Sequence, residues 1–462
     1  MCGIFGIFDH DEAANLTYLG LSSLQHRGQE ATGIACINND GTKMEVVKRG
    51  GLVAEGFGKE EIRRLKGKKA VGHVRYSTTG ASIVRNAQPL YVNYRHGDLA
   101  LVHNGNLLQS AKWRTTLEDK GAIFQSVSDT EILIHLMSRS DAKTLKDRVV
   151  DALSRVRGAY SLLFLGETGM VAARDPWGYR PLVIGKIDNS WVFSSETCAF
   201  SLINAQFVRS VEPGEVVLVN ENGLQSFFPF KEHKNKAKCI FEHVYFARPD
   251  TNMFGHSVYK TRVRSGRILA REHSCEADLV IPVPDSGIAA AIGYAEKSKI
   301  PFAMGLIRSH YVGRTFIEPS QSIRSFGVKL KLSPVKDLLE GKRVVVVDDS
   351  LVRGTTSRKI MDMIREAGAK EIHLRIACPP VTHSCFYGID TPTREELLAS
   401  SKNNREIANF VHADTLGYLS KAGLLDSMGD KNPESIYCTA CFDGNYPQSP
   451  SADLATNMPP SV

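Results

Sequence analysis

The chain has 462 residues, of which 42% are hydrophobic and 23% are charged, a balance typical of a globular protein with two or three domains. Its net charge is +7, but lysine and arginine are spread along the chain, which argues against a nucleic-acid partner and favours small phosphorylated substrates. Because no apolar run approaches the ~20 residues of a membrane-spanning helix and no signal peptide opens the chain, we expect a cytoplasmic protein with no membrane partner.

Residues 2–235 are predicted to form an α+β domain in which strands carry most of the order. Apolar residues recur at helical spacing over 16–24 and 130–137, which predicts two helices. Short alternating segments predict strands over residues 33–39, 45–50, 99–107, 160–166, 170–175, 182–187, 191–196 and 215–220. The charged, polar run at 231–238 is typical of a linker.

Cys2 directly follows Met1 in the opening MCGIFG. Removal of Met1 leaves a thiol and a free α-amino group on one residue, so that a nucleophile and its proton acceptor come together. Many chains also lose Met1 before a small residue, and Met-Cys alone is therefore a weak indication of catalysis. It becomes informative only beside groups that hold a substrate and stabilise an oxyanion.

Candidates for both tasks follow along the chain. Arg75 comes just after a predicted strand and can bind a carboxylate with two N–H groups. Asn104 and Gly105, in an Asn-Gly turn after another strand, offer a side-chain amide and a backbone N–H to an oxyanion. Asp129, at a predicted helix start, can pair with a substrate ammonium. Purely structural interpretations stay open at this point, with Asn-Gly as a hairpin turn and Asp129 as a helix N-cap.

Five motifs of this half resemble the glutamine amidotransferases of the N-terminal-nucleophile class: MCGIFG, LQHRGQEATG, GHVRYSTTG, HNGNL and SDTE, in this order. The resemblance implies an αββα sandwich in which Cys2 hydrolyses glutamine to glutamate and ammonia through a thioester. It also implies that Asn104 and Gly105 form the oxyanion hole. The residues that it implies beside the bound glutamine are Arg75 at the α-carboxylate, Asp129 at the α-amine, Arg27 and Gly28.

Residues 236–445 follow a different pattern, with near-continuous apolar strands that are each buried on both faces of a parallel sheet. This pattern predicts an α/β domain. The strands are predicted at 278–284, 343–349 and 373–378, and helices at 287–295 and 356–368. Residues 446–462 mix Pro, Ser, Asn and Ala without periodicity and are predicted to be a disordered tail.

The most specific motif is RVVVVDDSLVRGTTS at 343–357. Four valines lead into Asp348 and Asp349, and a turn of small residues then opens a helix. In an open α/β sheet the ligand lies beyond the carboxyl ends of the strands. The acidic pair can therefore meet sugar hydroxyls or a cation, while the backbone N–H groups of 353–356 can bind a phosphate. The alternative is an ordinary polar turn between strand and helix.

This motif resembles the phosphoribosyl-diphosphate loop of type I phosphoribosyltransferases. The resemblance implies that Asp348 and Asp349 hold the ribose hydroxyls and one Mg²⁺ per subunit, with Ser286 of IPVPDSG as a further ligand. It implies that the 5-phosphate is bound by Arg353, Gly354, Thr355 and Thr356. A long basic stretch lies between the two motifs, and long loops are often lids. The residues that we expect to close over the pyrophosphate are Arg308, Tyr311, Arg314, Lys329 and Lys331.

The chain contains nine cysteines, which in a cytosolic protein indicate catalysis or metal binding rather than disulfides. One C-x-x-C with scattered further cysteines fits either structural zinc or an iron–sulfur cluster, and the sequence alone leaves both open. The candidate ligands are Cys239, Cys385, Cys438 and Cys441. We expect Cys36, Cys198, Cys275 and Cys378 to be core residues.

Together, the two halves resemble the amidophosphoribosyltransferase family over nearly the whole chain. The implied reaction converts glutamine, phosphoribosyl diphosphate and water to phosphoribosylamine, glutamate and pyrophosphate, the first committed step of purine synthesis. Ammonia would pass inside the protein, and purine nucleotides would act as feedback inhibitors. The four cysteines match the branch that carries one 4Fe-4S cluster per subunit. Relatives of that branch often have a propeptide, whereas Met1 precedes Cys2 here, so we expect maturation by methionine removal alone.

We expect a homo-oligomer, a dimer or a tetramer. Two other functions are the alternatives. A glucosamine-phosphate or asparagine synthetase would share the glutaminase half, but the acidic motif at 343–357 argues against both. A nucleotide-sensing regulator that keeps a phosphoribosyltransferase fold and binds nucleic acid would leave Cys2, Arg75, Asn104 and Asp129 unexplained.

Overall fold

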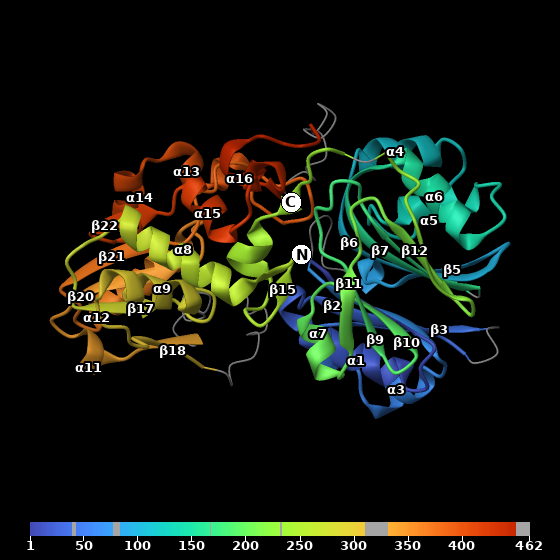
Figure 1. Cartoon of the computed structure of the whole chain (residues 1–462), viewed down its shortest axis with the longest axis horizontal. Coiled ribbons are helices and arrows are strands. Elements are labelled where there is room, and N and C mark those ends of the chain that lie inside the picture. The colour runs from blue at the N-terminus through green and yellow to red at the C-terminus, as the bar shows by residue number, and fades with distance from the viewer. Residues whose placement is uncertain (39–42, 77–83, 167, 232, 310–330, 450–462) are drawn as a thin grey trace.

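The computed structural model describes residues 1–38, 43–76, 84–166, 168–231, 233–309 and 331–449. Two halves lie side by side in Figure 1, the N-terminal half at the right and the C-terminal half at the left, and the N-terminus lies between them. Among the described residues, no helix has both the length and the apolar character needed to cross a membrane.

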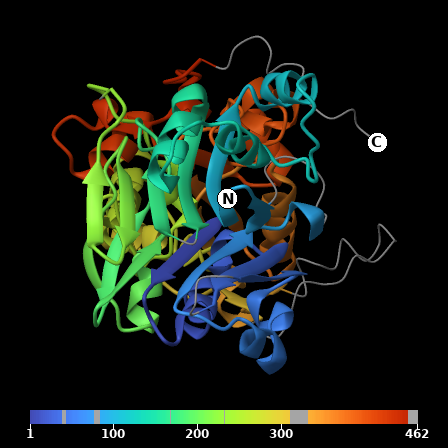
Figure 2. The ribbon, with the colours of Figure 1, turned by 90° about the vertical axis from the view of Figure 1, so that its right-hand side faces the viewer.

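Two antiparallel sheets stack face to face in the N-terminal half (Figure 2). The first contains β1 (Gly3–Phe8), β2 (Ala31–Ile37), β3 (Met44–Gly50), β4 (Lys69–Arg75), β9 (Val183–Ile187), β10 (Ser190–Ser194) and β11 (Gln206–Ser210), in the order β11-β9-β10-β1-β4-β2-β3. The second contains β5 (Leu90–Tyr94), β6 (Gly97–Leu108), β7 (Arg157–Gly166), β8 (Gly169–Arg174), β12 (Val216–Asn220) and β13 (Gly223–Phe227), in the order β13-β12-β8-β7-β6-β5. Apolar side chains such as Ile4, Val71 and Leu163 fill the space between the sheets.

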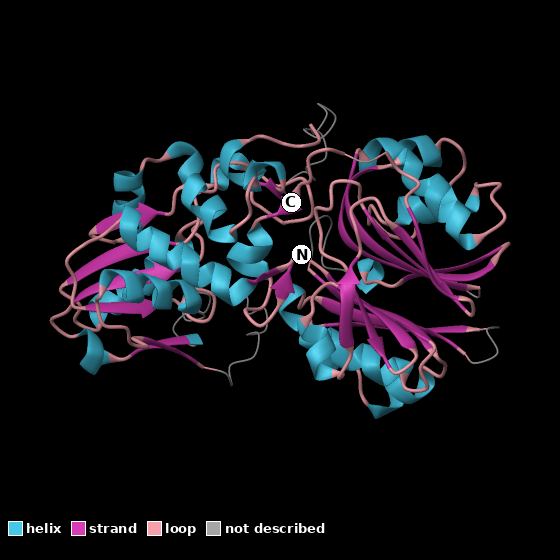
Figure 3. Cartoon of the chain, in the orientation of Figure 1, coloured by secondary structure: helices cyan, strands magenta, loops and turns pink. Residues whose placement is uncertain are grey.

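Helices cover the outer face of each sheet, which completes the predicted αββα sandwich (Figure 3). The first sheet carries α1 (Ala13–Ser23), α2 (Val53–Gly56), α3 (Lys59–Arg64) and α7 (Cys198–Leu202). The second carries α4 (Ser110–Glu118), α5 (Glu131–Ser138) and α6 (Leu145–Arg155). The predicted helices at 16–24 and 130–137 are confirmed as α1 and α5. Central strands such as β7 are buried on both faces, because each lies between a sheet and a helical layer.

The C-terminal half is built on a parallel sheet, as predicted. Its strands are β17 (Leu279–Pro282), β20 (Arg343–Asp348), β21 (Glu371–Ile376) and β22 (Thr415–Tyr418), in that order across the sheet. The helices around it are α8 (Val258–Glu272), α9 (Ile288–Ser298), α12 (Thr355–Glu366), α14 (Asn404–Val411) and α15 (Lys421–Met428). Val344–Val347 are fully buried, which explains why this strand shows no polar alternation.

Short elements connect and join the two halves. They are η1 (Gln25–Arg27), η2 (Val84–Asn86), β14 (Lys238–Cys239), η3 (Glu242–Phe246), β15 (Asn252–Met253), β16 (His256–Ser257), β18 (Leu306–Arg308), β19 (Leu332–Pro334), α11 (Lys336–Leu339), η4 (Arg394–Glu396), α13 (Leu398–Ser401), η5 (Pro433–Ser435), β23 (Tyr437–Cys438) and α16 (Ala440–Asp443). The parallel pair β14–β23 ties the chain just after the predicted linker to the C-terminal region.

The start of the predicted disordered tail, 446–462, is packed onto the N-terminal half instead. Gln448 is buried, and its side-chain oxygen accepts a hydrogen bond from the backbone N–H of Gly158 at 3.2 Å. The hydroxyl of Tyr387 donates to the backbone carbonyl of Gln448 at 2.5 Å. The prediction of disorder was wrong for residues 446–449, because tertiary hydrogen bonds hold a segment that has few apolar side chains. The rest of the tail lies outside the described residues.

Candidate active site

Cys2 lies at the junction of the two halves, beside the end of β4. Gly3 is paired with Val74 in the β1–β4 register, so the residue before Gly3 faces the residues that follow Val74. The Cys2 thiol donates to the carbonyl oxygen of Tyr76 at 3.5 Å. The Cys2 carbonyl accepts a hydrogen bond from Nε of Arg27 at 2.9 Å. The nucleophile is therefore fixed at its backbone and half-buried at its thiol.

Two of the side chains predicted for the glutamine site are buried and have unsatisfied hydrogen-bonding groups. Arg75 is 6% exposed, and its Nη1 makes no hydrogen bond to a described residue. Asn104 is fully buried, and neither its Oδ1 nor its Nδ2 has a partner among the described residues. An unsatisfied buried polar group costs about 1–3 kcal/mol, so both side chains are suited to a polar ligand.

Asn104 and Gly105 lie within β6, opposite Ser161 and Tyr160 of β7. The prediction of an Asn-Gly turn after the strand was wrong, because the strand continues through both residues. Gly105 has φ +155°, and a Cβ built there would lie 2.0 Å from the carbonyl oxygen of Ala159. Only glycine fits this position, because any side chain would collide with the neighbouring strand.

Asp129 is not the N-cap of α5, which was the purely structural interpretation of this residue. Its carboxylate accepts a hydrogen bond from the backbone N–H of Leu107 on β6 at 2.7 Å, and the N-cap of α5 is Thr130, not Asp129. The Thr130 hydroxyl contacts Nδ1 of His103 at 3.0 Å, and Gln88 accepts the backbone N–H of His103 at 2.7 Å. These contacts fix Asp129 to β6, the strand that carries the predicted oxyanion donors.

A second contact joins the ends of β4 and β6. Nε2 of His73 lies 3.2 Å from the carbonyl oxygen of His103, and burial lowers the pKa of both imidazoles. His73 stands two residues before Arg75, and His103 directly precedes Asn104. The contact thus brings the predicted carboxylate clamp and the predicted oxyanion donors to one place. The structure thus joins β4, which ends at Arg75, to β6, which carries Asn104 and Gly105, and the arrangement of these residues around Cys2 stays a prediction.

Gly28 and Arg27 also lie at this place. A Cβ on Gly28 would lie 2.5 Å from the backbone carbon of Arg75, so the absence of a side chain lets the segment after η1 approach the end of β4. Arg27 is 1% exposed, and its guanidinium binds the Cys2 carbonyl and the carboxylates of Glu196 and Glu242. Direct contact of Arg27 with glutamine stays a prediction.

The residues predicted to bind the ribose, Mg²⁺ and the 5-phosphate line a cavity of about 510 Å³. Asp348 ends β20 and Asp349 follows it, and both carboxylates are buried. Burial and the neighbouring Asp349 raise the pKa of Asp348 well above its usual range. Ser286, just after β17, lines the same cavity. The three oxygen donors predicted for Mg²⁺ therefore share one wall.

The N-terminus of α12 forms another wall of this cavity. Gly354 precedes the helix with φ +73°, a conformation that glycine adopts without strain. The first backbone N–H groups of a helix have no partner within it, and the helix dipole favours a negative charge at this end. The residues predicted for the 5-phosphate all line the cavity: Arg353, Gly354, Thr355 and Thr356. The geometry suits a phosphate.

Two of the predicted lid residues, Arg308 and Lys331, belong to the part of the chain that the structure describes, and neither lines this cavity. Arg308, at the end of β18, forms an ion pair with Asp285. Lys331 is exposed, and its carbonyl accepts the backbone N–H of Ser309 at 2.9 Å. Neither residue lines the cavity, because β18 pairs with β19 in a separate two-stranded sheet. The other predicted lid residues lie outside the described residues, namely Tyr311, Arg314 and Lys329.

The four candidate cysteine ligands gather where the predicted linker meets the C-terminal region. Cys239 and Cys438 are opposite each other in the β14–β23 pair, and Cys441 lies three residues further, in α16. Burial and the other three thiols, that of Cys385 included, raise the pKa of Cys441 well above its usual range. Among the described residues, no three His, Cys, Asp or Glu side chains form a group close enough for a single metal ion.

The remaining cysteines behave as predicted. Cys36, Cys198 and Cys378 are buried, and Cys275 packs against the core of the C-terminal half. Burial raises the pKa of Cys36 and of Cys198 to about 12, so both thiols stay protonated and unreactive at neutral pH. This separates them chemically from an activated nucleophile.

Tyr76 was missed by the sequence analysis and connects the two sites. Its carbonyl accepts the Cys2 thiol, and it also lines the cavity that contains Asp348 and Asp349. Tyr245 of η3 lines the cavity as well. The sequence holds a signal for Tyr76, which directly follows Arg75 in GHVRYSTTG, but none for Tyr245. Residues of both halves therefore form the wall of one cavity.

Each half of the chain matches a known domain family, and the whole chain is similar to known proteins that contain both domains. The profile of the glutamine amidotransferase domain matches residues 73–201, and that of the phosphoribosyl transferase domain matches residues 264–384. The amidophosphoribosyltransferase of Bacillus subtilis (strain 168) is 51% identical over 449 residues, which cover 96% of this chain and 94% of the relative. That of Methanocaldococcus jannaschii is 47% identical over 465 residues, covering 97% and 98%.

Solved structures give the same result over the whole fold. The glutamine phosphoribosylpyrophosphate amidotransferase from B. subtilis, complexed with ADP and GMP, superposes with a TM-score of 0.92 at 50% identity and covers 98% of each chain. A structure described as the allosteric regulatory enzyme of purine biosynthesis has the same TM-score and identity, and covers 98% of this chain and 97% of its own. At 51% identity over 96% of its length, the chain belongs to the amidophosphoribosyltransferase family.

Proposed function

We propose that this chain makes 5-phosphoribosylamine from glutamine, water and 5-phosphoribosyl 1-diphosphate, with glutamate and pyrophosphate as the other products. The observation that carries the proposal is the position of Tyr76. Its backbone carbonyl accepts a hydrogen bond from the Cys2 thiol, and the residue also lines the cavity that contains the acidic pair. A glutaminase site and a phosphate-binding site are thus neighbours within one protein. We propose that its two domains cover 2–235 and 236–445.

Glutamine hydrolysis begins once Met1 is removed. The Cys2 thiol gives its proton to its own α-amine, and the sulfur attacks the side-chain amide carbon of glutamine. The backbone N–H of Gly105 and Nδ2 of Asn104 donate to the oxyanion of the tetrahedral intermediate. Ammonia leaves with the proton returned by the amine, and water then cleaves the thioester to release glutamate. Arg75 and Asp129 hold the α-carboxylate and α-amine of glutamine throughout.

The second reaction takes place at the carboxyl end of β20. Ammonia adds to C1 of the sugar while the bond from C1 to the diphosphate oxygen breaks, and pyrophosphate leaves with both electrons of that bond. The N-terminus of α12 holds the 5-phosphate, so that C1 is fixed relative to the incoming ammonia. Asp348, Asp349 and Ser286 supply the oxygen ligands that suit Mg²⁺, which when bound neutralises charge on the leaving pyrophosphate.

We propose that ammonia passes from Cys2 to the sugar inside the protein. Free ammonia is mostly protonated at neutral pH, and the protonated form is not a nucleophile. The wall shared through Tyr76 and Tyr245 keeps the two reactions adjacent. Purine nucleotides are proposed as feedback inhibitors, because the B. subtilis relative was crystallised with ADP and GMP. A cytoplasmic location and a homo-oligomeric state stay predictions.

We propose one 4Fe-4S cluster on Cys239, Cys385, Cys438 and Cys441. Tetrahedral zinc needs its four sulfurs within about 4 Å of one another, given Zn–S bonds of about 2.3 Å. The four thiols interact with one another, yet they do not form so tight a group. A cluster holds each sulfur on a different iron and so spaces its ligands further apart. Four thiolates are the ligand set of such a cluster, and their positions resemble those of the cluster-bearing branch of the family.

Anaerobically purified protein is expected to be brown, with a broad absorption band near about 400 nm and about four irons per chain, as a 4Fe-4S cluster requires. Metal analysis and an absorption spectrum test this, and Cys438→Ser is expected to lose the band. Cys275→Ser, which changes a thiol away from the group, serves as the control. Stoichiometric zinc in colourless protein would contradict the cluster.

A paired assay tests the proposed function. Glutamate and pyrophosphate release are measured together, with glutamine present and phosphoribosyl diphosphate added or withheld. We expect the two products in a ratio near one to one when both substrates are present, and pyrophosphate release that requires a nitrogen donor. Pyrophosphate release that is independent of glutamine and ammonia would exclude the proposed reaction.

A further inference from the structure

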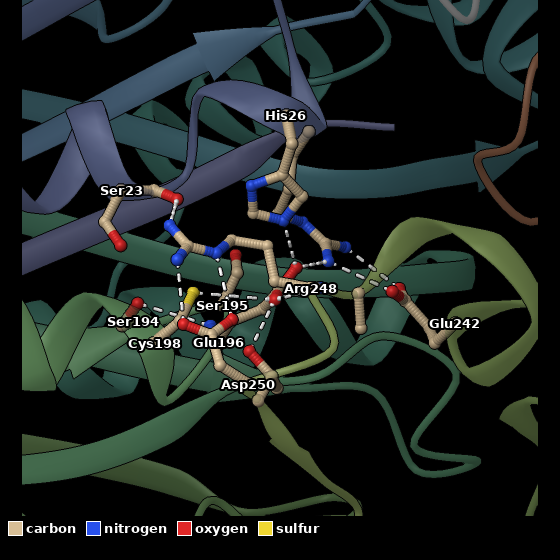
Figure 4. Close-up of polar contacts among 12 residues, drawn as sticks. Ser23, His26, Ser194, Ser195, Glu196, Cys198, Glu242, Arg248 and Asp250 are labelled. Carbon is tan, nitrogen blue, oxygen red and sulfur yellow. Dashed lines mark hydrogen bonds and ion pairs between the residues drawn. The ribbon is translucent and has the colours of Figure 1, made fainter. Parts of the chain in front are cut away.

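A buried network of charges joins the two halves and contacts the Cys2 carbonyl through Arg27. Figure 4 shows two of its carboxylates, Glu196 and Glu242, with dashed lines to the groups that they bind. The centre of the network is Arg27 of η1, which is 1% exposed, and its two carboxylates, Glu196 and Glu242, are fully buried. Glu196 follows β10 of the N-terminal half, whereas Glu242 begins η3 of the C-terminal half. Both carboxylates bind the same guanidinium. Nothing in the proposed mechanism uses Glu242.

The contacts of Arg27 leave its guanidinium little freedom. Nη1 and Nη2 donate to the two oxygens of Glu242 at 3.0 and 2.9 Å, which is a bidentate arrangement. Nη1 also donates to Glu196, and Nε donates to the Cys2 carbonyl at 2.9 Å. Because the guanidinium is planar and rigid, the two carboxylates determine where its Nε points. The Cys2 backbone is thereby fixed from the other half of the chain.

Glu196 is held independently of Glu242. It accepts hydrogen bonds from His26 at 2.8 Å, from the backbone N–H of Arg248 at 3.0 Å and from Thr251 at 2.8 Å. His26 and Arg27 lower the pKa of Glu196 far below its usual range despite its burial. Loss of Glu242 would therefore leave Arg27 attached on one side only, free to rotate about its contact with Glu196.

Glu242 also belongs to the segment that faces the other site. Tyr245 of the same η3 lines the cavity that contains Asp349. Arg262 of α8 donates to the carbonyls of His243 and Ala247 at 2.8 Å each, which fixes both ends of η3. One five-residue helix thus binds Arg27 through Glu242 near its start and lines the cavity of the acidic pair through Tyr245 near its end.

We propose that Glu242 is a positioning residue for the Cys2 nucleophile, acting through Arg27, a role that rests on the glutamine hydrolysis proposed above. Glu242 orients Arg27, and Arg27 holds the Cys2 carbonyl. The substitution Glu242→Gln places an NH₂ group against the N–H groups of Arg27, which removes the bidentate pair at nearly constant volume. Arg27 then loses one of its two carboxylate partners, and the buried Arg180, whose Nη1 lies 3.4 Å from Oε1 of Glu242, also loses this negative charge.

The test compares Glu242→Gln, Glu242→Asp and wild type as full-length protein. Glu242→Gln is expected to lower kcat for glutamine hydrolysis, and the rate of Cys2 alkylation by iodoacetamide, by roughly a hundredfold, with KM for glutamine little changed. Glu242→Asp keeps the charge and is expected to recover about tenfold of that loss. Ammonia-dependent phosphoribosylamine synthesis at high pH is expected to stay within about twofold. The control, Glu296→Gln, breaks an exposed ion pair with Arg267 and should change none of these rates.

Glutamine hydrolysis and Cys2 alkylation that stay within about twofold in Glu242→Gln would overturn the inference. A parallel fall of the ammonia-dependent rate would also overturn it, because Glu242 would then support the fold as a whole. A wild-type chain that neither hydrolyses glutamine nor is alkylated at Cys2 would instead refute the proposed function itself. The wild-type measurement thus separates the two failures.

Discussion

Cys2→Ala is expected to abolish glutamine-dependent synthesis of phosphoribosylamine, with a loss of about 10⁴-fold or more, because it removes the thiol proposed as the nucleophile. Synthesis from added ammonia at high pH is expected to stay within about twofold of wild type, since the cavity of the acidic pair keeps its wall. The measurement is pyrophosphate release with each nitrogen donor, on the same preparation.

Cys275→Ala is the matched control for Cys2→Ala. This half-buried thiol lies in the C-terminal half, where its Sγ contacts the hydroxyl of Tyr294 at 3.7 Å. Both routes are expected to survive its loss. An equal decline of the glutamine-dependent and ammonia-dependent rates in Cys2→Ala would contradict a two-site enzyme. Full glutamine-dependent activity in that variant would remove Cys2 from the reaction.

Asp348→Asn is expected to remove both routes to phosphoribosylamine, lowering each by about 10³-fold, because it deletes a carboxylate from the set that meets the sugar and Mg²⁺. The same change is expected to raise Tm. Two buried neighbouring carboxylates repel each other, and this repulsion with burial raises the pKa of Asp348. Asparagine removes the repulsion and keeps an oxygen for the backbone N–H of Asp349, which Asp348 accepts at 2.9 Å.

The control for this variant is Asp362→Asn on α12, whose carboxylate is exposed and pairs with His412. It should leave both rates and Tm nearly unchanged. Alkylation of Cys2 by iodoacetamide in Asp348→Asn should match wild type, because the glutaminase residues are untouched. Normal ammonia-dependent activity in Asp348→Asn would contradict its placement at the sugar. A lower Tm would contradict the argument from charge repulsion.

The sequence is most informative where the predicted site residues are neighbours along the chain. Asp348 to Thr356 form one strand end and one helix start, so a local pattern is enough to identify them. The same local pattern misled at Asn104 and Gly105, because Asn-Gly most often marks a hairpin turn. Pairing with β7 overrides that preference and keeps both residues in β6.

Contacts between distant residues were beyond prediction. Arg27 and Glu242 are 215 positions apart, and nothing in CIFEHVYF distinguishes Glu242 from an exposed glutamate. Tyr387 likewise holds Gln448 through tertiary contacts alone, although the local composition predicts disorder. Such residues are found only when the fold shows which charges are buried together.

The continuity of β6 has a consequence for control of the enzyme. The proposed oxyanion donors stand in a strand that is hydrogen-bonded to β7 and fixed by Asp129 at Leu107. Moving them would break a central ladder of the sandwich, which costs far more than a loop movement. A bound inhibitor or substrate must therefore control glutamine hydrolysis by moving other groups. These are the Cys2 nucleophile and Arg75 at the end of β4.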